Sequence, residues 1–358
     1  MNKEKLGNKI KEYFEYKWMY DDKESWMRIE NSRLTPVPVS YAFYFVDYQN
    51  TYYSEINDDY MDCSIVIYNG GIPQAIWPLS VSKNGGNETD SYVLGTFGQE
   101  LLPPFVEETK YNEESLRKLY KKCIEMICNV CAIFNIKSVQ GKFLVMDKGN
   151  SLFYQKIREE LDCFVVDALT ECFVDLSYDE QDILTKIRRT NKYSIQKAKD
   201  YWKIEIVTKY DNRNYIDLCF EQFQKLHLEV AGRKTRSDQS WEKQRNAVED
   251  TDDFLVMMRE NSGKLIGASL YCCTKTTCTY AVGAYDRSCF NKPVTHLSQW
   301  EAIKHCKKLN KRWYYVGRRP YIGDTLKPSE KELAIGHFKE GFATELYNSI
   351  IIRANTSI

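Results

Sequence analysis

The sequence predicts an α/β protein with mixed sheets, built from two tandem units of the same architecture. One order of elements occurs twice: a strand, a glycine turn, two more strands, a loop, a helix and a further strand. The third strand has the pattern Tyr-x-x-Gly-x-aromatic in both copies, at Tyr92–Phe97 and Tyr280–Tyr285. The glycine turns at 69–71 and 262–264 are separated by nearly the same offset. This agreement indicates a duplicated α/β unit and not a solenoid. The alternative is two ordinary hairpins that each precede a helix.

Length and composition are those of a globular chain with two or three domains. The 358 residues are enough to bury a sizeable core, and 43% hydrophobic with 28% charged residues is ordinary for such a chain. The formal net charge is zero. Any contact with nucleic acid or an anionic membrane must therefore come from a local patch.

The twelve cysteines are scattered and form no paired ligand sets. Cys128 and Cys131 form a CxxC inside an apolar helical run, where both thiols are expected to pack as small hydrophobic groups. Adjacent Cys272 and Cys273 are expected to point to opposite faces of a strand. No metal site is expected. Unpaired thiols, no apolar signal segment and no bilayer-spanning run together predict a cytoplasmic protein. Peripheral attachment at the inner membrane face is the alternative.

The first half begins with helical periodicity over about residues 1–30, which predicts a packing helix, with a membrane-surface helix as the alternative. Residues 40–47 have the pattern of a strand. The Asn-Gly turn at 69–71 predicts a hairpin, because such turns match the twist of paired strands. The remaining elements expected here are strands at 63–68, 73–79 and 92–97, a helix at 113–135 and a strand at 136–140.

The second half begins with a strand at 171–177 and a basic helix at 179–201. The helix has one apolar face, and six cations without an acid lie between Lys186 and Lys199. Such a local excess predicts an anionic ligand, and a solvated helix face is the alternative. Further strands are expected at 204–207, 254–258, 265–271, 278–285, 313–316 and 347–353, and helices at 215–230, 237–248 and 295–309.

Five segments carry a resemblance to a known family. They are Ile187–Ala198 in the form Ile-Arg-Arg-x-x-x-x-x-Ile-x-Lys-Ala, Gly267–Tyr271, Tyr280–Tyr285, Leu297–Ile303, and 335–342 in the form Ile-x-x-Phe-Lys-x-Gly-Phe. Together they resemble the FemABX-type transferases and FemAB-like acyltransferases, a branch of the GNAT superfamily. The resemblance is clear from about residue 175 to 342 and only architectural before that.

The resemblance implies two GNAT-like domains, with the C-terminal strand returning to the first. We expect the first domain to cover 1–165 plus 345–358, and the second 166–344. Family members transfer an acyl or aminoacyl group from aminoacyl-tRNA or a thioester to an amine on a cell-envelope precursor. The implied co-substrate is thus a carried acyl group (on tRNA, CoA or acyl carrier protein), with no permanently bound cofactor. The implied acceptor is a phosphate-bearing envelope or sugar precursor.

The family's Phe-Lys pair corresponds to Phe338 and Lys339. By resemblance, Lys339 neutralises a phosphate or the negative charge that develops during acyl transfer. For a general base, His296 and Asp286 flank the loop and helix where a ligand is expected. The other substrate-binding candidates are chosen by position. They lie in the basic helix, the loop at 231–236, the third strand and the strand end at 317–321, and they are Arg188, Arg189, Lys192, Arg233, Tyr285, Arg318, Arg319 and Tyr321.

One departure bears on the acyl donor. Acetyl-CoA-dependent GNAT enzymes present backbone N–H groups to the pyrophosphate through a glycine-containing loop before a helix. The equivalent loop here, 286–293, has no glycine. Ordinary CoA binding is therefore disfavoured, whereas the aminoacyl-tRNA branch tolerates that absence. No heptad run corresponds to the coiled-coil arm of FemA-like enzymes.

No Gly-x-Ser-x-Gly nucleophile elbow is present, so direct attack by the amine is the expected mechanism, with the substrate as its own base. Three alternatives stay open. They are a sugar N-acyltransferase that uses an acyl-CoA or acyl carrier, a non-catalytic module that binds tRNA or a sugar nucleotide, and a structural partner protein.

Overall fold

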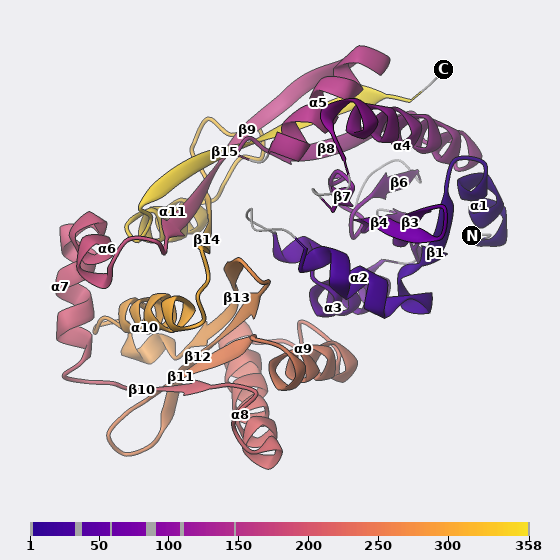
Figure 1. Ribbon diagram of the computed structural model, residues 1–358. Helices are drawn as coiled ribbons and strands as arrows, with labels where there is room; N and C mark the ends of the chain where they lie inside the picture. The colour runs from indigo at the N-terminus through magenta and orange to yellow at the C-terminus, as the bar shows by residue number, and fades with distance from the viewer. Residues whose placement is uncertain are drawn as a thin grey trace.

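The computed structural model shows two lobes that share one long pair of strands (Figure 1). Helices α1–α5 lie in one lobe and α6–α10 in the other, while β9 and β15 run across both. The predicted α/β class with mixed sheets is confirmed. The structure describes residues 3–32, 38–57, 59–83, 91–107, 111–146 and 148–356.

An eight-stranded sheet connects the two halves of the chain. Only β13 and β14 are parallel to each other; the remaining neighbours are antiparallel. The C-terminal strand β15 is hydrogen-bonded on one side to β9 and on the other to β8 from the first half. In spatial order the strands are β10 (Lys203–Val207), β11 (Phe254–Arg259), β12 (Leu265–Cys273), β13 (Thr277–Tyr285), β14 (Trp313–Arg319), β9 (Cys163–Asp175), β15 (Glu345–Asn355) and β8 (Ser138–Leu144).

The tandem order of elements is present in both halves, but its strands pair differently. In the second half β11, β12 and β13 form one continuous meander, as predicted. In the first half the corresponding strands divide between two small sheets, and the predicted hairpin is β3 with β4. The boundary expected between residues 165 and 166 lies inside β9 and stays a prediction. The first small sheet contains β1 (Glu15–Trp18), β3 (Ile65–Asn69), β4 (Ile72–Trp77) and β7 (Phe105–Val106). The second contains β2 (Tyr60–Asp62), β5 (Ser80–Lys83) and β6 (Tyr92–Gly95).

Two predictions of local structure in the first half are wrong. Residues 40–47 are not a strand, since α3 begins at Phe43 and buries Phe43, Val46, Asp47 and Asn50 at helical spacing. The region 1–30 holds two helices, α1 and α2, separated by strand β1. The helices of the first half are α1 (Lys3–Lys11), α2 (Lys23–Glu30), α3 (Phe43–Ile56), α4 (Glu113–Ile133) and α5 (Lys148–Glu160).

The predicted basic helix is broken into α6 and α7 at Ile187–Arg188. Arg188 has an extended ψ of 136°, and its backbone N–H donates to the Gly341 carbonyl instead of to a helical partner. A tertiary hydrogen bond to the segment after α11 thus replaces a helical one, which the local sequence does not reveal. The helices of the second half are α6 (Glu180–Lys186), α7 (Arg189–Ala198), α8 (Arg213–Ala231), α9 (Asp238–Asp250), α10 (Thr295–Lys308) and α11 (Glu330–Glu340).

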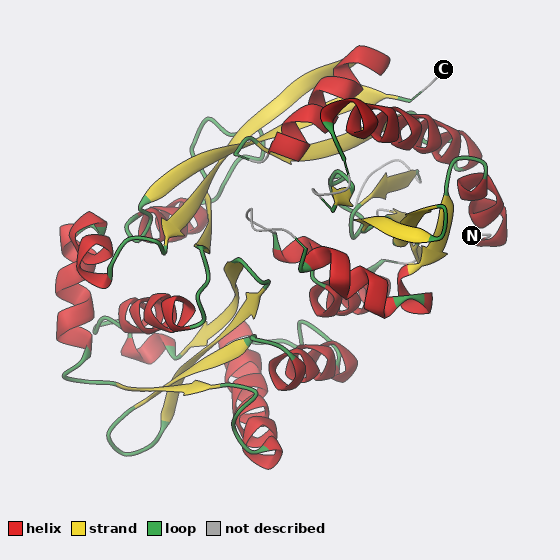
Figure 2. Ribbon diagram, viewed as in Figure 1, coloured by secondary structure: helices red, strands yellow, loops and turns green. Residues whose placement is uncertain are grey.

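Strands of the second half are covered by helices on both faces (Figure 2). Alternate residues of β12 enter two different cores: Tyr271 and Cys273 pack with α7 and α10, whereas Leu270 and Cys272 pack with α8 and α9. The predicted opposite orientation of Cys272 and Cys273 is therefore confirmed. Burial on both faces explains why these strands are nearly continuous apolar runs.

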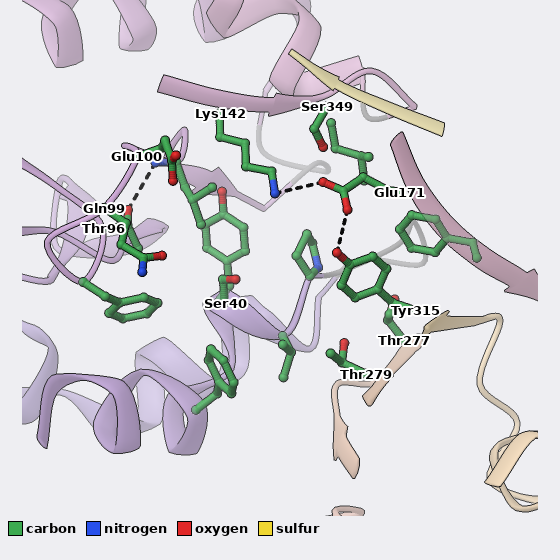
Figure 3. A pocket seen from close by; sticks show the side chains of 18 residues that line it. Ser40, Thr96, Gln99, Glu100, Lys142, Glu171, Thr277, Thr279, Tyr315 and Ser349 are labelled. Atoms are coloured by element: carbon green, nitrogen blue, oxygen red, sulfur yellow. Dashed lines mark hydrogen bonds and ion pairs between the residues drawn. The ribbon is translucent and has the colours of Figure 1, made fainter. Parts of the chain in front are cut away.

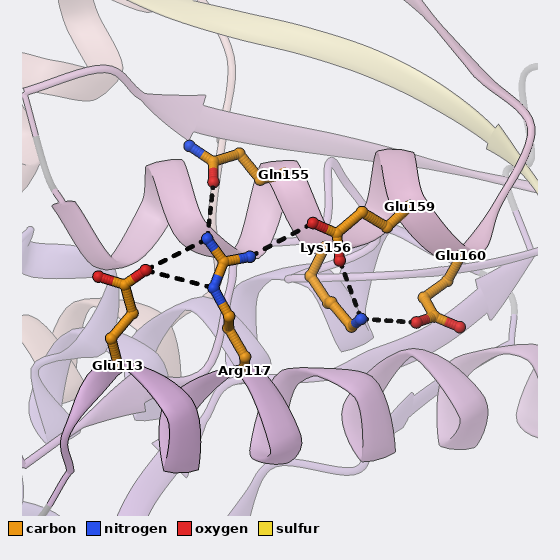
Figure 4. Close-up of polar contacts among 6 residues, drawn as sticks. All are labelled: Glu113, Arg117, Gln155, Lys156, Glu159 and Glu160. Carbon is orange, nitrogen blue, oxygen red and sulfur yellow. Dashed lines mark hydrogen bonds and ion pairs between the residues drawn. The ribbon is translucent and has the colours of Figure 1, made fainter.

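Helices α4 and α5 lie side by side and are joined by a polar network on their exposed surface (Figure 4). Arg117 lies 3.3 Å from both Glu113 and Glu159. Lys156 lies 2.9 Å from Glu159 and 2.7 Å from Glu160. Exposed pairs of this kind contribute about 0–1 kcal/mol each. The buried face of α4 therefore stabilises this pair of helices more than the ion pairs do. Cys128 and Cys131 lie on that buried face, as predicted. No helix in the described part of the chain combines the length and hydrophobicity needed to cross a membrane.

A cavity of about 490 Å³ lies where α2 and α3 meet the second half, and its walls carry buried carboxyl groups from both. Burial, with a smaller contribution from nearby Asp253, raises the pKa of Glu30 to about 8, although the Phe43 N–H donates to the carboxylate. Burial also raises the pKa of Asp253 to about 6. The neighbouring Asp252 is paired with Lys209 and Lys311.

We expect Glu30→Gln to stabilise the protein above pH 8 and to have little effect near pH 4.5. Because the folded-state pKa is raised, the protonated form is favoured in the native state, and stability is lost as the pH rises from about 4.5 through 8. Each pKa unit corresponds to about 1.4 kcal/mol, so a gain of several kcal/mol is expected at high pH. Urea unfolding at both pH values measures it, with Glu24→Gln, an exposed position on the same helix, as the control. A gain that is equal at both pH values would contradict this assignment.

Candidate functional site

The parallel strands β13 and β14 separate near the middle of the large sheet. Thr277–Thr279 of β13 pair with Trp313–Tyr315 of β14, and the pairing ends there. Beyond it, β13 continues to Tyr285 and β14 to Arg319. The carboxyl ends of the two strands therefore diverge, and their backbone N–H and C=O groups beyond this segment do not hydrogen-bond to each other. Openings of this kind at the carboxyl ends of parallel strands are frequent ligand sites in α/β proteins.

Lys339 lies beside this opening. Its side chain extends from α11 over Gly317 of β14, and a Cβ atom at Gly317 would lie 2.4 Å from the Lys339 Nζ. Among the described residues, Lys339 has no ion pair and no hydrogen bond from its ammonium group. Burial lowers its pKa, while Cys172 and Glu171 act in the opposite direction. A half-buried ammonium group without an acceptor is available to a ligand.

His296 and Phe338 form an aromatic cluster next to Lys339. The ring centroids of His296 and Phe338 are 5.0 Å apart, and Phe342 packs against both. The His296 Nδ1 atom is buried without a partner among the described residues. Burial lowers the pKa of His296 to about 4, so the imidazole is neutral at physiological pH.

Glu340 gathers two of the predicted arginines at the C-terminal end of α11. Its Oε2 atom lies 3.0 Å from Arg188 and 3.3 Å from Arg319, and Arg319 also lies over the Tyr321 ring at 4.6 Å. Arg318, on the other face of β14, is paired with Asp324. These cations are already partly neutralised. The two predicted cations on α7 differ from each other. Arg189 is exposed, whereas the Lys192 Nζ donates to the Thr185 carbonyl oxygen.

Three predicted residues lie apart from this cluster. Asp286 accepts hydrogen bonds from the Ser288 N–H and hydroxyl and lies 3.2 Å from Lys264, and these bonds lower its pKa. Tyr285 donates to the Ser269 and Ser298 hydroxyls in a buried network. Arg233 lines a separate cavity between α8 and α9. In the described part of the chain no hydrogen bond or ion pair joins these three residues to Lys339, although Tyr285 belongs to the same hydrophobic core as Phe338 and Phe342.

A second feature, absent from the sequence-based set, lies on the opposite face of the sheet. Successive residues of a strand point to opposite faces, so Cys172 of β9 faces the α11 side and Glu171 faces the other. On that face a cavity of about 300 Å³ lies between the two halves (Figure 3). The residues that line it in the described part of the chain are mainly Pro38–Tyr41, Phe45, Thr96, Phe97, Gln99, Glu100, Leu102, Lys142, Leu144, Glu171, Phe173, Thr277, Thr279, Tyr315 and Ser349.

Glu171 lies at the polar end of this cavity, with Lys142 and Tyr315 converging on it (Figure 3). It is only 2% exposed. Its Oε2 atom accepts a 2.6 Å hydrogen bond from Tyr315, and its Oε1 atom lies 2.9 Å from the Lys142 Nζ. Burial by itself raises the pKa of Glu171, but Lys142 and Tyr315 outweigh it and the pKa is lowered. The carboxyl group is therefore ionised at neutral pH. Burial and Glu171 raise the pKa of Tyr315 well above its usual value, so its hydroxyl stays a donor.

Sequence reasoning missed this cavity because its residues come from segments that are far apart in the chain. The signal that could have revealed it is Glu171 itself, a charged residue in the apolar strand that ends at Asp175. An isolated charge inside such a strand is rarely buried unless it is paired.

The fold is similar to several solved structures, although the sequences have diverged far. FemX superimposes with a TM-score of 0.63 at 12% identity, covering 94% of this chain and 96% of FemX. The C-terminal domain of a lysylphosphatidylglycerol synthetase from Agrobacterium fabrum gives 0.56 at 13% identity, with 94% and 92% covered. L-PGS from Bacillus licheniformis gives 0.51 at 11% identity, with 81% and 83% covered. No protein-family model and no curated protein matches the sequence. At these identities the likeness establishes the FemX-type fold that the sequence motifs implied.

Proposed function

We propose that the protein transfers an acyl or aminoacyl group from a carrier to an amine on a cell-envelope or surface-glycan precursor. The observation that carries this proposal is the Lys339 ammonium group, which has no acceptor among the described residues and lies beside the opening between β13 and β14. The FemX-type fold supports it, because the family that the sequence resembles performs this class of reaction in that fold.

The chemistry requires charge stabilisation more than a nucleophilic side chain. The amine nitrogen attacks the carbonyl carbon of the donor, a C–N bond forms, and the C–O or C–S bond to the carrier breaks. The nitrogen loses a proton and the leaving oxygen or sulfur gains one, so the overall step is balanced. Negative charge develops on the carbonyl oxygen in between, and Lys339 is placed to donate to it.

The assignment of a general base stays open. His296 is neutral and can accept a proton, but its pKa of about 4 makes it a weak base. Asp286 is occupied with its own turn and with Lys264. We therefore retain direct attack by an amine that has already lost its proton. The reaction should accelerate as the pH rises toward the pKa of the acceptor amine.

The donor is proposed to be an aminoacyl-tRNA. The loop at 286–293 has no glycine, and Arg287–Cys289 form a short helical turn at the position where backbone would approach a pyrophosphate. The exposed basic surface of α7, including Arg189, gives a carrier with a phosphate backbone a place to dock.

A donor screen with the purified protein tests this proposal. Charged tRNAs and acyl-CoAs are offered separately with a pool of amine-bearing nucleotide sugars, and mass changes in the pool are followed. Transfer from charged tRNA is the expected result. Rapid transfer from acetyl-CoA would overturn the choice of donor, and no transfer from either class would overturn the enzymatic proposal.

A further inference from the structure

The cavity between the two halves has the construction of a binding site. Glu171 is 2% exposed and lines the cavity; Lys142 lies 2.9 Å from its Oε1 atom, Tyr315 donates to its Oε2 atom, and the Ser349 hydroxyl is its third polar neighbour. A carboxylate can accept about four hydrogen bonds. A buried carboxylate with unused capacity that faces an open cavity is poised for a donor from a ligand.

The charge of the lining selects the sign of that ligand. Glu171 and Glu100 are the acids and Lys142 is the cation among the described residues that line the cavity. Lys142 is already held by Glu171, and Glu100 has no ion pair in the described part of the chain. The described part of the lining therefore has a net negative formal charge. A phosphate or carboxylate would meet repulsion from these residues and find no unpaired cation among them, whereas an ammonium group would be attracted.

Most of the remaining surface of the cavity is apolar, although the side chains of Ser40, Thr96, Gln99, Thr277 and Thr279 also line it. Phe45, Phe97 and Phe173 contribute rings, and Val39 and Leu144 contribute aliphatic groups. A ligand stem that fills this volume should be mainly aliphatic or aromatic, because the apolar part of the lining offers a polar stem no partners for the hydration it loses.

We propose that this cavity holds the amine-bearing end of the acceptor, as an ammonium group at Glu171 on an apolar or aromatic stem, with any phosphate of the acceptor kept outside. Naming the ligand as the acceptor rests on the proposed function. The proposal that an ammonium group binds here does not depend on that function, because it is argued from the geometry and charge of the cavity.

The location of the cavity fits an acceptor. Thr277, Thr279 and Tyr315 line it, and they belong to the last paired residues before β13 and β14 separate. Lys339 lies near the same point on the other face of the sheet, beside Gly317. An amine held near Tyr315 is therefore next to the opening through which a donor carbonyl would be presented.

Glu171 is suited to bind the amine and not to deprotonate it. The charge of Lys142 lowers the pKa of Glu171 in spite of burial, and a carboxylate of low pKa is a weak base near neutral pH. We therefore assign Glu171 to recognition. The amine must lose its proton in a separate step before it attacks.

The test measures binding without any donor, by calorimetry at pH 8. The probe is 2-phenylethylamine, with 2-phenylethanol as its neutral and 3-phenylpropanoate as its anionic counterpart. The amine should bind at least about tenfold more tightly than either, because only the ammonium group can donate a charge-assisted hydrogen bond to the Glu171 carboxylate. Glu171→Gln should abolish that preference.

Glu114→Gln, on the exposed surface of α4 and paired only with Lys118, is the matched control and should leave binding unchanged. Equal binding of amine and alcohol would overturn the proposal, as would unchanged preference in Glu171→Gln. If that variant does not fold, the comparison of the amine with the alcohol on the wild-type protein decides the proposal. Because no donor is used, amine binding without any transfer would refute the proposed function and leave this site standing. If the protein transfers the acyl group but shows no preference for the amine, the binding site at Glu171 is refuted and the proposed function is retained.

Discussion

Replacing Lys339 by methionine is expected to lower kcat by about 10²–10³-fold while the protein stays folded. Methionine keeps an apolar stem of similar length over Gly317 but removes the charge, so packing and electrostatics are separated. The loss should be in kcat more than in KM, because the charge on the carbonyl oxygen develops only during the reaction.

The control for this prediction is Lys331→Met, an exposed position on the same helix. It should retain full activity. Thermal unfolding of both variants shows whether a loss of activity is a loss of structure. If Lys339→Met turns over acceptor at the wild-type rate, Lys339 does not stabilise the transition state.

Replacing Gly317 by alanine is expected to impair both stability and activity. Gly317 has φ of +127°, a conformation that costs residues with a Cβ about 1–3 kcal/mol. The added methyl group would also lie 2.4 Å from the Lys339 Nζ and displace that side chain from the opening. We expect a lower urea midpoint together with a fall in kcat that approaches that of Lys339→Met.

Gly323→Ala is the matched comparison, since a Cβ there meets no heavy atom within 4 Å. Its stability should lie within about 0.5 kcal/mol of the wild type. Gly317→Ala with the same stability and activity as Gly323→Ala would show that the close approach of Lys339 to β14 has no role.

The elements that local chemistry determines were predictable from the sequence. The hairpin of β3 and β4 has an Asn-Gly turn, and the meander of β11 to β13 has apolar runs bounded by turns, so both were found. Helix α3 was missed because its dense aromatic residues also fit a strand. The break at Arg188 was missed because it depends on Gly341, far away in the chain.

The candidate site divides in the same way. Phe338 and Lys339 were identified because they lie in one short motif, and the structure brings them together with His296. Their proposed roles stay predictions. The cavity at Glu171 could not be anticipated from a local pattern, since Lys142, Glu171 and Tyr315 belong to three different strands. Only sheet pairing brings β8, β15, β9 and β14 together in that order.

The most direct measurement of the central claim is the position of the transferred group on the product. Acceptor recovered after incubation with charged tRNA is analysed by tandem mass spectrometry before and after treatment with alkaline hydroxylamine, which cleaves oxygen esters and spares amides. We predict an acyl group on nitrogen that survives the treatment, formed by the wild type and not by Lys339→Met. An ester on oxygen, or equal product from both proteins, would contradict acyl transfer to an amine at Lys339.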